Sequence, residues 1–529
     1  MSYHTYRPER VPQRLDAIVI GSGIGGLAVA ACLAKAGKAV LVLERHYVAG
    51  GFTHTFKRRE YEWDVGVHYI GEVHSQKSVM RRALDYISDN ALKWAPMSEV
   101  YDKIFFGDES YEFVAGVDNF KTLLKDRFPQ EARAIDTYID LVHQLARSAQ
   151  GFFMEKALPP LVAKIASPFL TSKFMKLARQ TTWEVLSSLT QDKKLIGVLT
   201  AQWGDYGLPP RQSSFAIHAM VAKHYFDGGA YPVGGSSSFV KTIAPVIEKA
   251  GGKVLVKAEV EKVLVRQGRV VGVRLANGDE ILAPIVISDA GVVNTYQRLL
   301  PSHLVTEFKL GEKLNRIPAS ESHICLYMGL KHTAQELGLG QSNYWIYPDY
   351  DHDINLERFR KDPMAPLPVT YISFPSAKDP TWQEHHPKTA TLEAIGVAPY
   401  QWFERWGETE WQKRGDDYKN FKERLSHRLL ENVYRYVPQV KDKIDYHELS
   451  TPLTTEHFSN YHRGEIYGLE HSPERFRQRW LRPHTPIKNL FLTGQDIVTA
   501  GIGGALFGGI LTAATVLKRN VMSDIMRHI

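Results

Sequence analysis

The sequence is poor in cysteine. Its 529 residues include two, Cys32 and Cys325, too few for a disulfide framework or a cysteine-ligated zinc site, so we expect a reducing compartment and no metal. The first sixteen residues, "MSYHTYRPERVPQRLD", lack the apolar run of a secretory signal. We therefore expect a cytoplasmic protein, associated peripherally with a membrane for reasons given below.

The composition is that of a basic globular protein. A net charge of +7 favours acidic partners or an anionic membrane surface. The sequence contains neither zinc-finger spacing nor an RNP-like motif, so nucleic acid is not expected as a partner. The chain is longer than one ordinary domain, and two domains sharing an interface are the default expectation.

Two uncharged stretches imitate membrane spans, at residues 17–34 and 497–517. Both are interrupted by glycine, a poor interior residue for a helix. The first divides into a buried strand over residues 16–20, an alanine-rich helix that ends near Gly37, and a second buried strand over residues 39–44. The pattern predicts a βαβ unit instead of an anchor.

The turn of this unit carries Gly21-x-Gly23-x-x-Gly26, with Gly25 beside it. Such spacing permits a tight turn, close approach of the backbone to a pyrophosphate, and close packing of helix on strand. The start of the helix then offers free N–H groups to the phosphates. Glu44 follows at the distance expected for an acid that binds a ribose. The motif predicts a dinucleotide site.

Two further segments favour FAD over a nicotinamide cofactor. Directly after Glu44 come Arg45 and the pair Gly50-Gly51, in a segment that resembles the double-glycine turn of glutathione-reductase-type and amine-oxidase-type flavoproteins. The C-terminal segment "NLFLTGQDIVTAGIGGALFGGILTAATVL", which begins at Asn489, also resembles these proteins. The resemblance implies that Gly494 and Asp496 hold the ribityl chain and that the helix start at Ile502 and Gly503 faces the flavin.

Residues 251–291 alternate β-branched and polar residues, with a hairpin turn at Asn277–Asp279. They resemble the inserted strands of an FAD domain, which implies that Val260 lies near the adenine. The predicted fold class is α/β, with a discontinuous glutathione-reductase-type Rossmann FAD domain and an inserted α+β substrate domain. We expect FAD-domain parts at residues 1–90, 230–300 and 480–529, and substrate-domain parts at 91–229, the membrane-facing one, and 301–479.

Several long motifs resemble one narrower group. They include "AGGFTHTF", "EWDVGVHYIGE", "FAIHAMVAKHYFDGGAYPVGGSS", "FPSAKDPTW" and "RGEIYGLEH". Together they resemble the retinol saturases nearly end to end, with carotenoid isomerases and bacterial phytoene desaturases as wider relatives. The resemblance implies an FAD-dependent enzyme that saturates a double bond of a retinoid- or carotenoid-like polyene. Isomerisation and desaturation on the same flavin remain open, as does a non-enzymatic escort of prenyl chains or lipids.

Reduction of an unactivated polyene requires a proton as well as a hydride. In "EWDVGVHYIGE", His68 and Tyr69 are the candidates for this role. The alternative is that Asp64 and His68 bond to each other and shape a loop. We expect FAD to be bound non-covalently. A second GxGxxG unit is lacking, so the external electron donor is open, with NADPH one candidate.

The segment from Lys156 to Trp183 suggests how an insoluble polyene reaches the enzyme. It carries five basic residues and no acidic one before Trp183, alternating with apolar runs. Such a segment can lie on an anionic bilayer. We expect a peripheral membrane contact through this segment, with a solvated helix packed on the substrate domain as the alternative.

Overall fold

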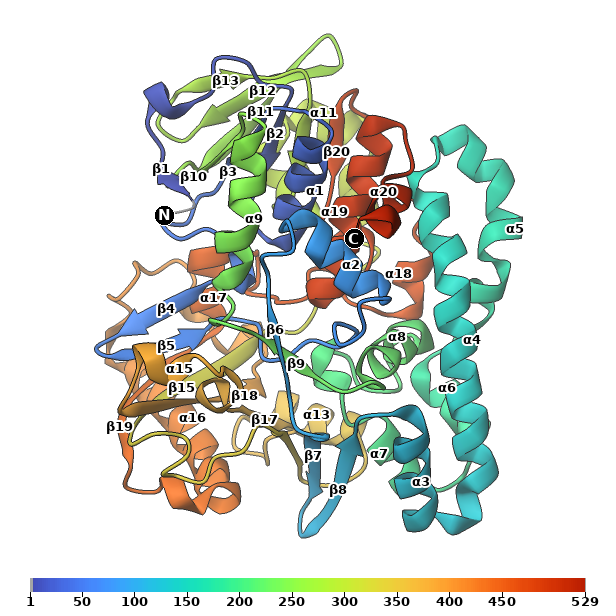
Figure 1. Cartoon of the computed structure of the whole chain (residues 1–529), viewed down its shortest axis with the longest axis vertical. Coiled ribbons are helices and arrows are strands. Elements are labelled where there is room, and N and C mark those ends of the chain that lie inside the picture. Colours follow the sequence, from blue (N-terminus) through green and yellow to red (C-terminus); the bar gives the residue numbers. More distant parts are fainter. Residues whose placement is uncertain (1–2, 529) are drawn as a thin grey trace.

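The computed structural model describes residues 3–528. Its upper part in Figure 1 is a parallel sheet that contains, within those residues, six strands. Their order is β1 (His4–Thr5), β10 (Lys253–Val256), β3 (Val40–Leu43), β2 (Ala17–Ile20), β14 (Val286–Ser288) and β20 (Leu490–Leu492). Neighbouring strands come from the two ends and the middle of the chain, so the predicted discontinuous α/β fold is confirmed.

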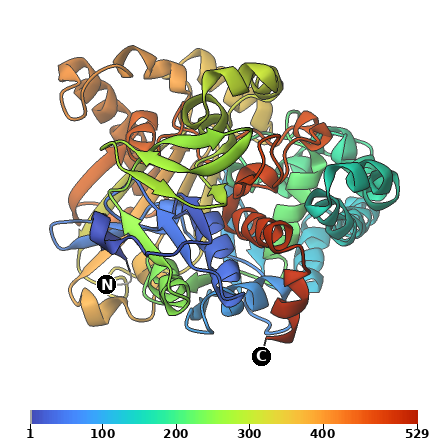
Figure 2. The same cartoon turned by 90° about the horizontal axis from the view of Figure 1, so that it is seen from above.

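Both uncharged stretches are helices of the core. α1 (Ile24–Lys35) is buried along nearly its whole length, and α19 (Gly501–Leu517) lies beside it (Figure 2). A β-carbon on Gly509 would lie 2.6 Å from the Gly25 carbonyl oxygen and 2.9 Å from the Val29 nitrogen. Glycine is therefore what lets the two backbones approach.

A search of residues 3–528 for membrane spans gives no single helix that is long and apolar enough. α19 satisfies the criteria only together with α20 (Val521–Arg527), to which it is bent by 118°.

The central piece forms the predicted antiparallel strands. They are β11 (Val260–Arg266), β12 (Arg269–Leu275) and β13 (Glu280–Leu282). The turn at Asn277–Asp279 joins the last two, with the Asn277 Oδ1 accepting a hydrogen bond from the Asp279 N–H at 3.1 Å. Val260, at the start of β11, lies close to the carboxyl end of β3, because Ala258 N–H donates to the Glu44 carbonyl at 2.8 Å.

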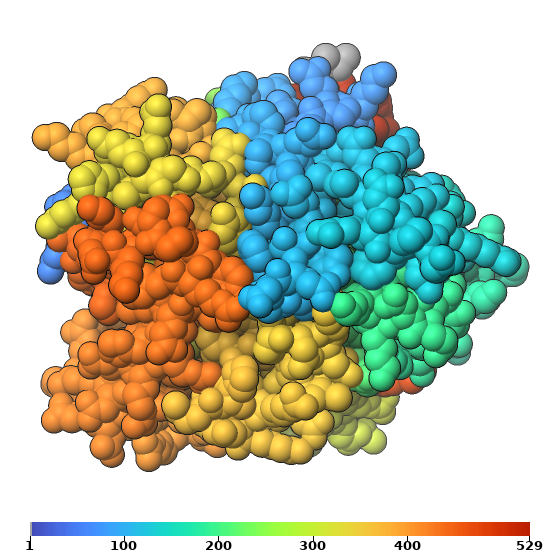
Figure 3. Space-filling view, turned by 90° about the horizontal axis from the view of Figure 1, so that it is seen from below, coloured from blue at the N-terminus to red at the C-terminus, as the bar shows by residue number. Residues whose placement is uncertain are grey.

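A second, mixed sheet contains seven strands within the described residues and occupies the lower part of Figure 1. In order they are β19 (Ile444–Ser450), β15 (His323–Lys331), β18 (Thr389–Val397), β17 (Thr370–Ser373), β16 (Asn343–Tyr347), β7 (Val100–Phe106) and β8 (Glu109–Val114). One face packs on α16 (Gly415–Tyr436). Seen from below, surface from the early part of the chain lies directly against surface from its later part (Figure 3), as the pairing of β7 with β16 requires.

A short hairpin, β4 (Thr55–Arg58) and β5 (Tyr61–Asp64), fixes the loop after β5 on the inner face of this second sheet. Tyr61 lies against Gly329 so closely that a β-carbon there would overlap its ring. Trp63 Nε1 donates to the Met328 carbonyl at 3.0 Å. Both side chains are fully buried, so the chain that follows Asp64 has little freedom.

Two long helices, α4 (Ala132–Ala157) and α5 (Pro160–Ala178), run along the right side of Figure 1. The other helices of four or more residues within residues 3–528 connect these elements. They are α2 (Val79–Ile87), α3 (Val117–Arg127), α6 (Thr182–Ser187), α7 (Lys193–Leu199), α8 (Phe215–Tyr225), α9 (Ser238–Lys249), α11 (Ser302–Glu307), α12 (Leu310–Leu314), α13 (His352–Lys361), α14 (Pro375–Lys378), α15 (Trp382–His385), α17 (Pro452–Ser459) and α18 (Pro473–Arg477). Two three-residue strands, β6 (Trp94–Pro96) and β9 (Ala230–Pro232), pair beside them.

The prediction that the basic stretch faces outward from Lys156 is wrong at its first residue. Lys156 is buried, and its Nζ donates to the Leu481 carbonyl at 2.8 Å and the Ile497 carbonyl at 2.9 Å. Burial, with Arg475 and Arg482 nearby, lowers the pKa of Lys156 to about 7. This ammonium ties α4 to the C-terminal segment and contributes nothing to the surface.

Candidate active site

A cavity of about 1720 Å³ extends from the glycine turn of the first sheet to the inner face of the second. Most of the residues predicted for a site line it. They are Gly21, Gly23, Gly25, Glu44, Arg45, Gly51, His68, Tyr69, Val260, Ile502 and Gly503. Gly26, Gly50, Gly494 and Asp496 are not among the residues that line the cavity.

The glycine turn is packed as tightly as its spacing requires. A β-carbon on Gly26 would overlap the carbonyl oxygen of Gly21, and one on Gly51 would lie 2.9 Å from the α-carbon of Gly23. α1 begins directly after Gly23, so the free N–H groups of its first turn lie at the cavity wall. This arrangement can accept an anionic group such as a pyrophosphate.

Glu44 organises the turn from the end of β3. Its Oε2 accepts hydrogen bonds from Ser22 N–H at 3.0 Å and from the Ser22 hydroxyl at 2.7 Å. Its Oε1 accepts from His46 N–H at 2.8 Å. Gly50 N–H donates to the same Ser22 hydroxyl at 2.9 Å. Carboxylate, serine and double-glycine segment thus form one unit at the cavity wall.

Asp496 faces away from the cavity. Its Oδ2 accepts from Val292 N–H at 2.8 Å and its Oδ1 from Leu469 N–H at 3.0 Å. Both carboxylate oxygens therefore hold neighbouring loops, and the Asp496 side chain positions the wall on which α19 begins. A direct contact between Asp496 and a ligand stays a prediction.

Sequence reasoning missed Asp289, which follows β14 and lines the cavity beside the glycine turn. A β-carbon on Gly25 would lie 2.5 Å from its Oδ1 and one on Gly23 2.7 Å from its Oδ2. Burial raises the pKa of Asp289 to about 8, with Glu44 and Asp496 adding to the rise and the Gly26 N–H opposing it. At neutral pH this side chain is a neutral acid that can donate a hydrogen bond. Its sequence signal was an acid directly after a buried strand.

The residues along this part of the cavity fit a dinucleotide with a large aromatic head. The glycine turn, Glu44, Val260 and the start of α19 all line the cavity. At that helix start Gly501 has a φ of +77°, and a β-carbon on it would meet nothing within 4 Å. A helix N-terminus beside an open wall can stabilise negative charge on a ring system.

His68 lies where the cavity meets the second sheet. Its Nδ1 is 2.8 Å from Oε2 of Glu393, a fully buried residue of β18. Burial, together with the Lys378 ammonium, lowers the pKa of His68 to about 3. Histidine 68 is therefore a neutral imidazole. The predicted alternative, a bond between Asp64 and His68, is wrong: Asp64 accepts from Tyr231 and from Ser236 N–H at 2.9 Å.

Tyr69 points into a neighbouring acidic cluster. Its hydroxyl lies 3.0 Å from Asp102 Oδ2 and 3.3 Å from Asp205 Oδ2, and its ring stacks on Tyr225 at 4.2 Å. Burial raises the pKa of Asp205 well above its usual value, with Asp102 adding to the rise. Tyr69 and Asp205 both line the cavity, so a second group of weak acids faces it.

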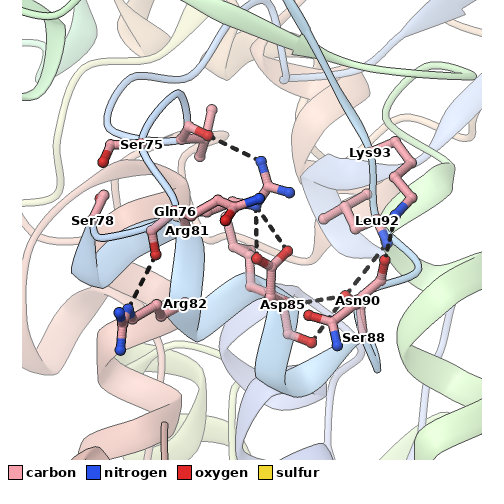
Figure 4. A network of polar contacts seen from close by, with 12 residues as sticks. Ser75, Gln76, Ser78, Arg81, Arg82, Asp85, Ser88, Asn90, Leu92 and Lys93 are labelled. Atoms are coloured by element: carbon pink, nitrogen blue, oxygen red, sulfur yellow. Dashed lines mark hydrogen bonds and ion pairs between the residues drawn. The ribbon is translucent and has the colours of Figure 1, made fainter. Parts of the chain in front are cut away.

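The rim of the cavity has apolar side chains and is held in place by hydrogen bonds around α2. Val79, Met154 and Met526 line the cavity and are partly exposed. Figure 4 shows the contacts around α2, where Arg81 faces Asp85 at 2.7 Å and Arg82 reaches the Gln76 carbonyl at 3.1 Å. Arg82 Nη1 also donates to the Met526 carbonyl at 2.6 Å, which joins α2 to α20 along this rim.

Residues 24–386 match the model of the family described as flavin containing amine oxidoreductase. All-trans-retinol 13,14-reductase from Danio rerio is 40% identical over 532 residues, covering 97% of this chain and 87% of the relative. A second Danio rerio relative, described as inactive all-trans-retinol 13,14-reductase, is 34% identical and covers 98% and 89%. The predicted resemblance to the retinol saturases is thus confirmed.

Among solved structures, a wild-type putrescine oxidase bound to putrescine is similar to this chain, with a TM-score of 0.62 and 16% identity. The similarity covers 96% of this chain and 99% of the oxidase. At this identity the likeness bears on the fold, and it confirms the predicted glutathione-reductase-type Rossmann architecture.

The position of Asp289 predicts how flavin binding depends on pH. Because the pKa of Asp289 is about 8, ionisation above that pH places a negative charge beside the predicted phosphate site. We expect the affinity of the apoprotein for FAD to fall above pH 8, approaching about tenfold per pH unit for one coupled proton. Asp289→Asn, which stays neutral, should remove this fall.

The dissociation constant is measured by quenching of flavin fluorescence on both sides of pH 8. Glu280→Gln, a change at an exposed acid of β13, is the matched control and should retain the wild-type pH dependence. Equal affinity of the wild type on both sides of pH 8 would contradict this placement of the phosphates.

Proposed function

The chain belongs to the flavin-containing amine oxidoreductase family, and from that premise we propose that it is an FAD-dependent enzyme that saturates one double bond of a retinoid-like polyene. The observation that carries the proposal is the 40% identity with a retinol 13,14-reductase over 97% of the chain. A relative of 34% identity that is described as inactive makes a direct assay necessary.

The cavity supports a long apolar substrate. Beyond the glycine turn it is lined by side chains from the inner face of the second sheet, where alternate residues of each strand point the same way. This set comprises Tyr327, Trp345, Val369, Tyr371, Ile395 and Val397. An aromatic and apolar wall excludes water and holds a polyene by its shape, so chain depth selects the reacting bond.

We infer FAD as the flavin, held non-covalently by the glycine turn, Glu44, Arg45, Gly51, Val260 and the start of α19. Bound there, reduced flavin supplies a hydride to the substrate. Arg45 supports this wall by donating from Nη1 to the His457 carbonyl at 2.8 Å. The two cysteines are buried in strand and helix cores away from the cavity lining. NADPH is one candidate for the external electron donor.

His68 is the proposed proton-transferring residue. It lines the cavity at the junction of the cofactor end and the aromatic end, and its ring packs edge-on against Tyr371 at 5.4 Å. Tyr69, through its acidic cluster, is the second candidate. The N–H of a neutral imidazole is a weak acid. His68 can therefore give up its proton only if a partner supplies another proton to the ring.

The first prediction of this proposal concerns the product. Chemically reduced enzyme incubated with all-trans-retinol should yield a product two hydrogens heavier, because a hydride and a proton add across one double bond. Mass spectrometry of extracted products distinguishes the alternatives, since isomerisation leaves the mass unchanged and desaturation lowers it. Products of unchanged mass with retinol and with carotenoids would refute the saturase assignment.

We further propose that the rim of the cavity lies on an anionic membrane surface. α5 exposes Leu161, Ile165 and Phe169, which are 81%, 75% and 85% accessible. The turn before it, Leu158 and Pro159, lines the cavity, so the exposed apolar face continues into the rim. Lys164, Lys173 and Lys176 are exposed along the same helix, which suits anionic headgroups.

Ile165→Glu combined with Phe169→Glu should abolish most binding to vesicles that contain anionic lipid. Burial of one large apolar side chain is worth about 1.5–3 kcal/mol, so a loss of at least tenfold is expected. Flotation measures the bound fraction, and charge reversal at Lys173 and Lys176 or added salt should weaken it as well.

Leu282→Glu is the control, because Leu282 is also exposed, at 58%, but lies on β13. It should bind vesicles like the wild type. Equal flotation of the wild type and the α5 double variant would remove the membrane proposal.

A further inference from the structure

Glu393 is a carboxyl group in a place that disfavours charge. It lies in the middle of β18, "TATLEAIGV", and is the single ionisable residue of that strand. It is fully buried, on the same face as Ile395 and Val397, which line the cavity. A carboxylate at this position would lose its hydration, which lowers the stability of the fold. Packing alone therefore does not explain why the strand carries a glutamate here.

Polar and titratable groups from several elements surround Glu393. Tyr327 of β15 pairs with Glu393, and Cys325 lies two residues away on the same face of β15. Ser373 of β17 pairs with Glu393 on the other side of β18. Asp64 and His68 approach from the end of β5 and the loop after it, and Tyr231 approaches from β9. From α14, Lys378 donates to Ser373 Oγ at 2.8 Å and to the His68 carbonyl at 2.9 Å.

Within residues 3–528, neither Glu393 oxygen has a hydrogen bond of good geometry, while its Oε2 lies 2.8 Å from His68 Nδ1. Burial raises the pKa of Glu393 to about 8, although Lys378 and the Asp64 N–H oppose the rise. The raised pKa favours a carboxyl that holds its proton at neutral pH, and His68 Nδ1, which also lacks a hydrogen bond, is close enough at 2.8 Å to receive that proton once the two groups align. A neutral ring that accepts a proton at Nδ1 carries its own proton on Nε2, and His68 lines the cavity.

We propose that Glu393 stores the proton consumed by the reaction and that His68 relays it into the cavity. The proposal deepens the proposed function and depends on it for the substrate. A reduced flavin bound in the cavity would supply the hydride to one alkene carbon, and His68 would give its Nε2 proton to the neighbouring carbon. The Nδ1 lone pair then takes the Glu393 proton.

The relay leaves a defined end state. His68 stays neutral with its proton on Nδ1, and Glu393 becomes a carboxylate that accepts from that N–H. Burial lowers the pKa of Lys378 to about 7 while the charge of Glu393 raises it, so the new carboxylate favours a protonated Lys378 that offsets its charge. A proton from solvent restores the starting state after the product leaves. Each turnover consumes one hydride and one proton, and charge is conserved.

The decisive variant is Glu393→Gln. Its amide can still donate a hydrogen bond to His68 Nδ1, but it has no proton to transfer. We expect turnover to fall by about 10²–10⁴-fold, the usual contribution of a positioned acid, with the flavin spectrum and FAD affinity unchanged. If Glu393 only positions His68, Glu393→Gln should keep its turnover, and that result would overturn the proposal in favour of another acid such as Asp205.

Glu465→Gln is the matched control. Glu465 is also buried, with a pKa raised to about 7 by burial, but it accepts from Arg463 N–H at 2.9 Å and does not line the cavity. We expect its turnover to equal that of the wild type. A comparable loss in both variants would mean that removal of any buried acid impairs the fold, and the relay would lose its support.

Infrared spectroscopy of protein labelled with ¹³C-glutamate tests the proton without catalysis. A protonated glutamic-acid band that disappears near pH 8 should be present in the wild type, remain in Glu465→Gln and be absent from Glu393→Gln, which keeps only the band of Glu465 that disappears near pH 7. Absence of this band in the wild type would overturn the proposal. If wild-type enzyme reduces no polyene while the band behaves as expected, the proposed function fails and the protonated Glu393–His68 pair stands.

Discussion

Contact between α1 and α19 is the constraint on which the cofactor end of the cavity depends. The two helices come from opposite ends of the chain and meet through glycine, so that the Gly509 position lies against the backbone of Gly25 and Val29. The contact places the glycine turn, Asp289 and the start of α19 around one space. Asp496 reinforces it from behind, with both carboxylate oxygens bound to loop N–H groups.

The substrate end depends on a different kind of contact. The hairpin β4–β5 is held to the second sheet by Tyr61 and Trp63, and the loop that follows carries His68 to Glu393. Burial shifts four of the cavity's groups toward neutrality: the pKa of Glu393 and Asp289 rises, while that of His68 and Lys378 falls. A cavity with such neutral polar groups can hold an apolar polyene and still provide protons.

Local patterns in the sequence predicted what depends on near neighbours. The βαβ unit and the turn at Asn277–Asp279 follow from glycine spacing, apolar runs and turn residues, which act over a few positions. Partners distant in sequence were not predictable. Lys156 belongs to a basic stretch whose composition is typical of a surface. Its buried ammonium nevertheless donates hydrogen bonds to two carbonyls that are distant in the sequence. A bond between His68 and Asp64 was the alternative interpretation of the motif, but the structure places His68 Nδ1 2.8 Å from Glu393, a residue of a strand far along the chain. An isolated glutamate in an otherwise uncharged strand was the available signal.

A crystal structure of the FAD-loaded protein with bound retinol tests the central claim most directly, namely that one cavity holds cofactor and polyene with His68 at their junction. The account predicts the phosphates at the start of α1, the flavin ring at the start of α19, and one polyene double bond between the ring and His68 Nε2 at hydrogen-transfer distance. A polyene bound with no double bond near both the ring and His68, or phosphates away from the glycine turn, would contradict it.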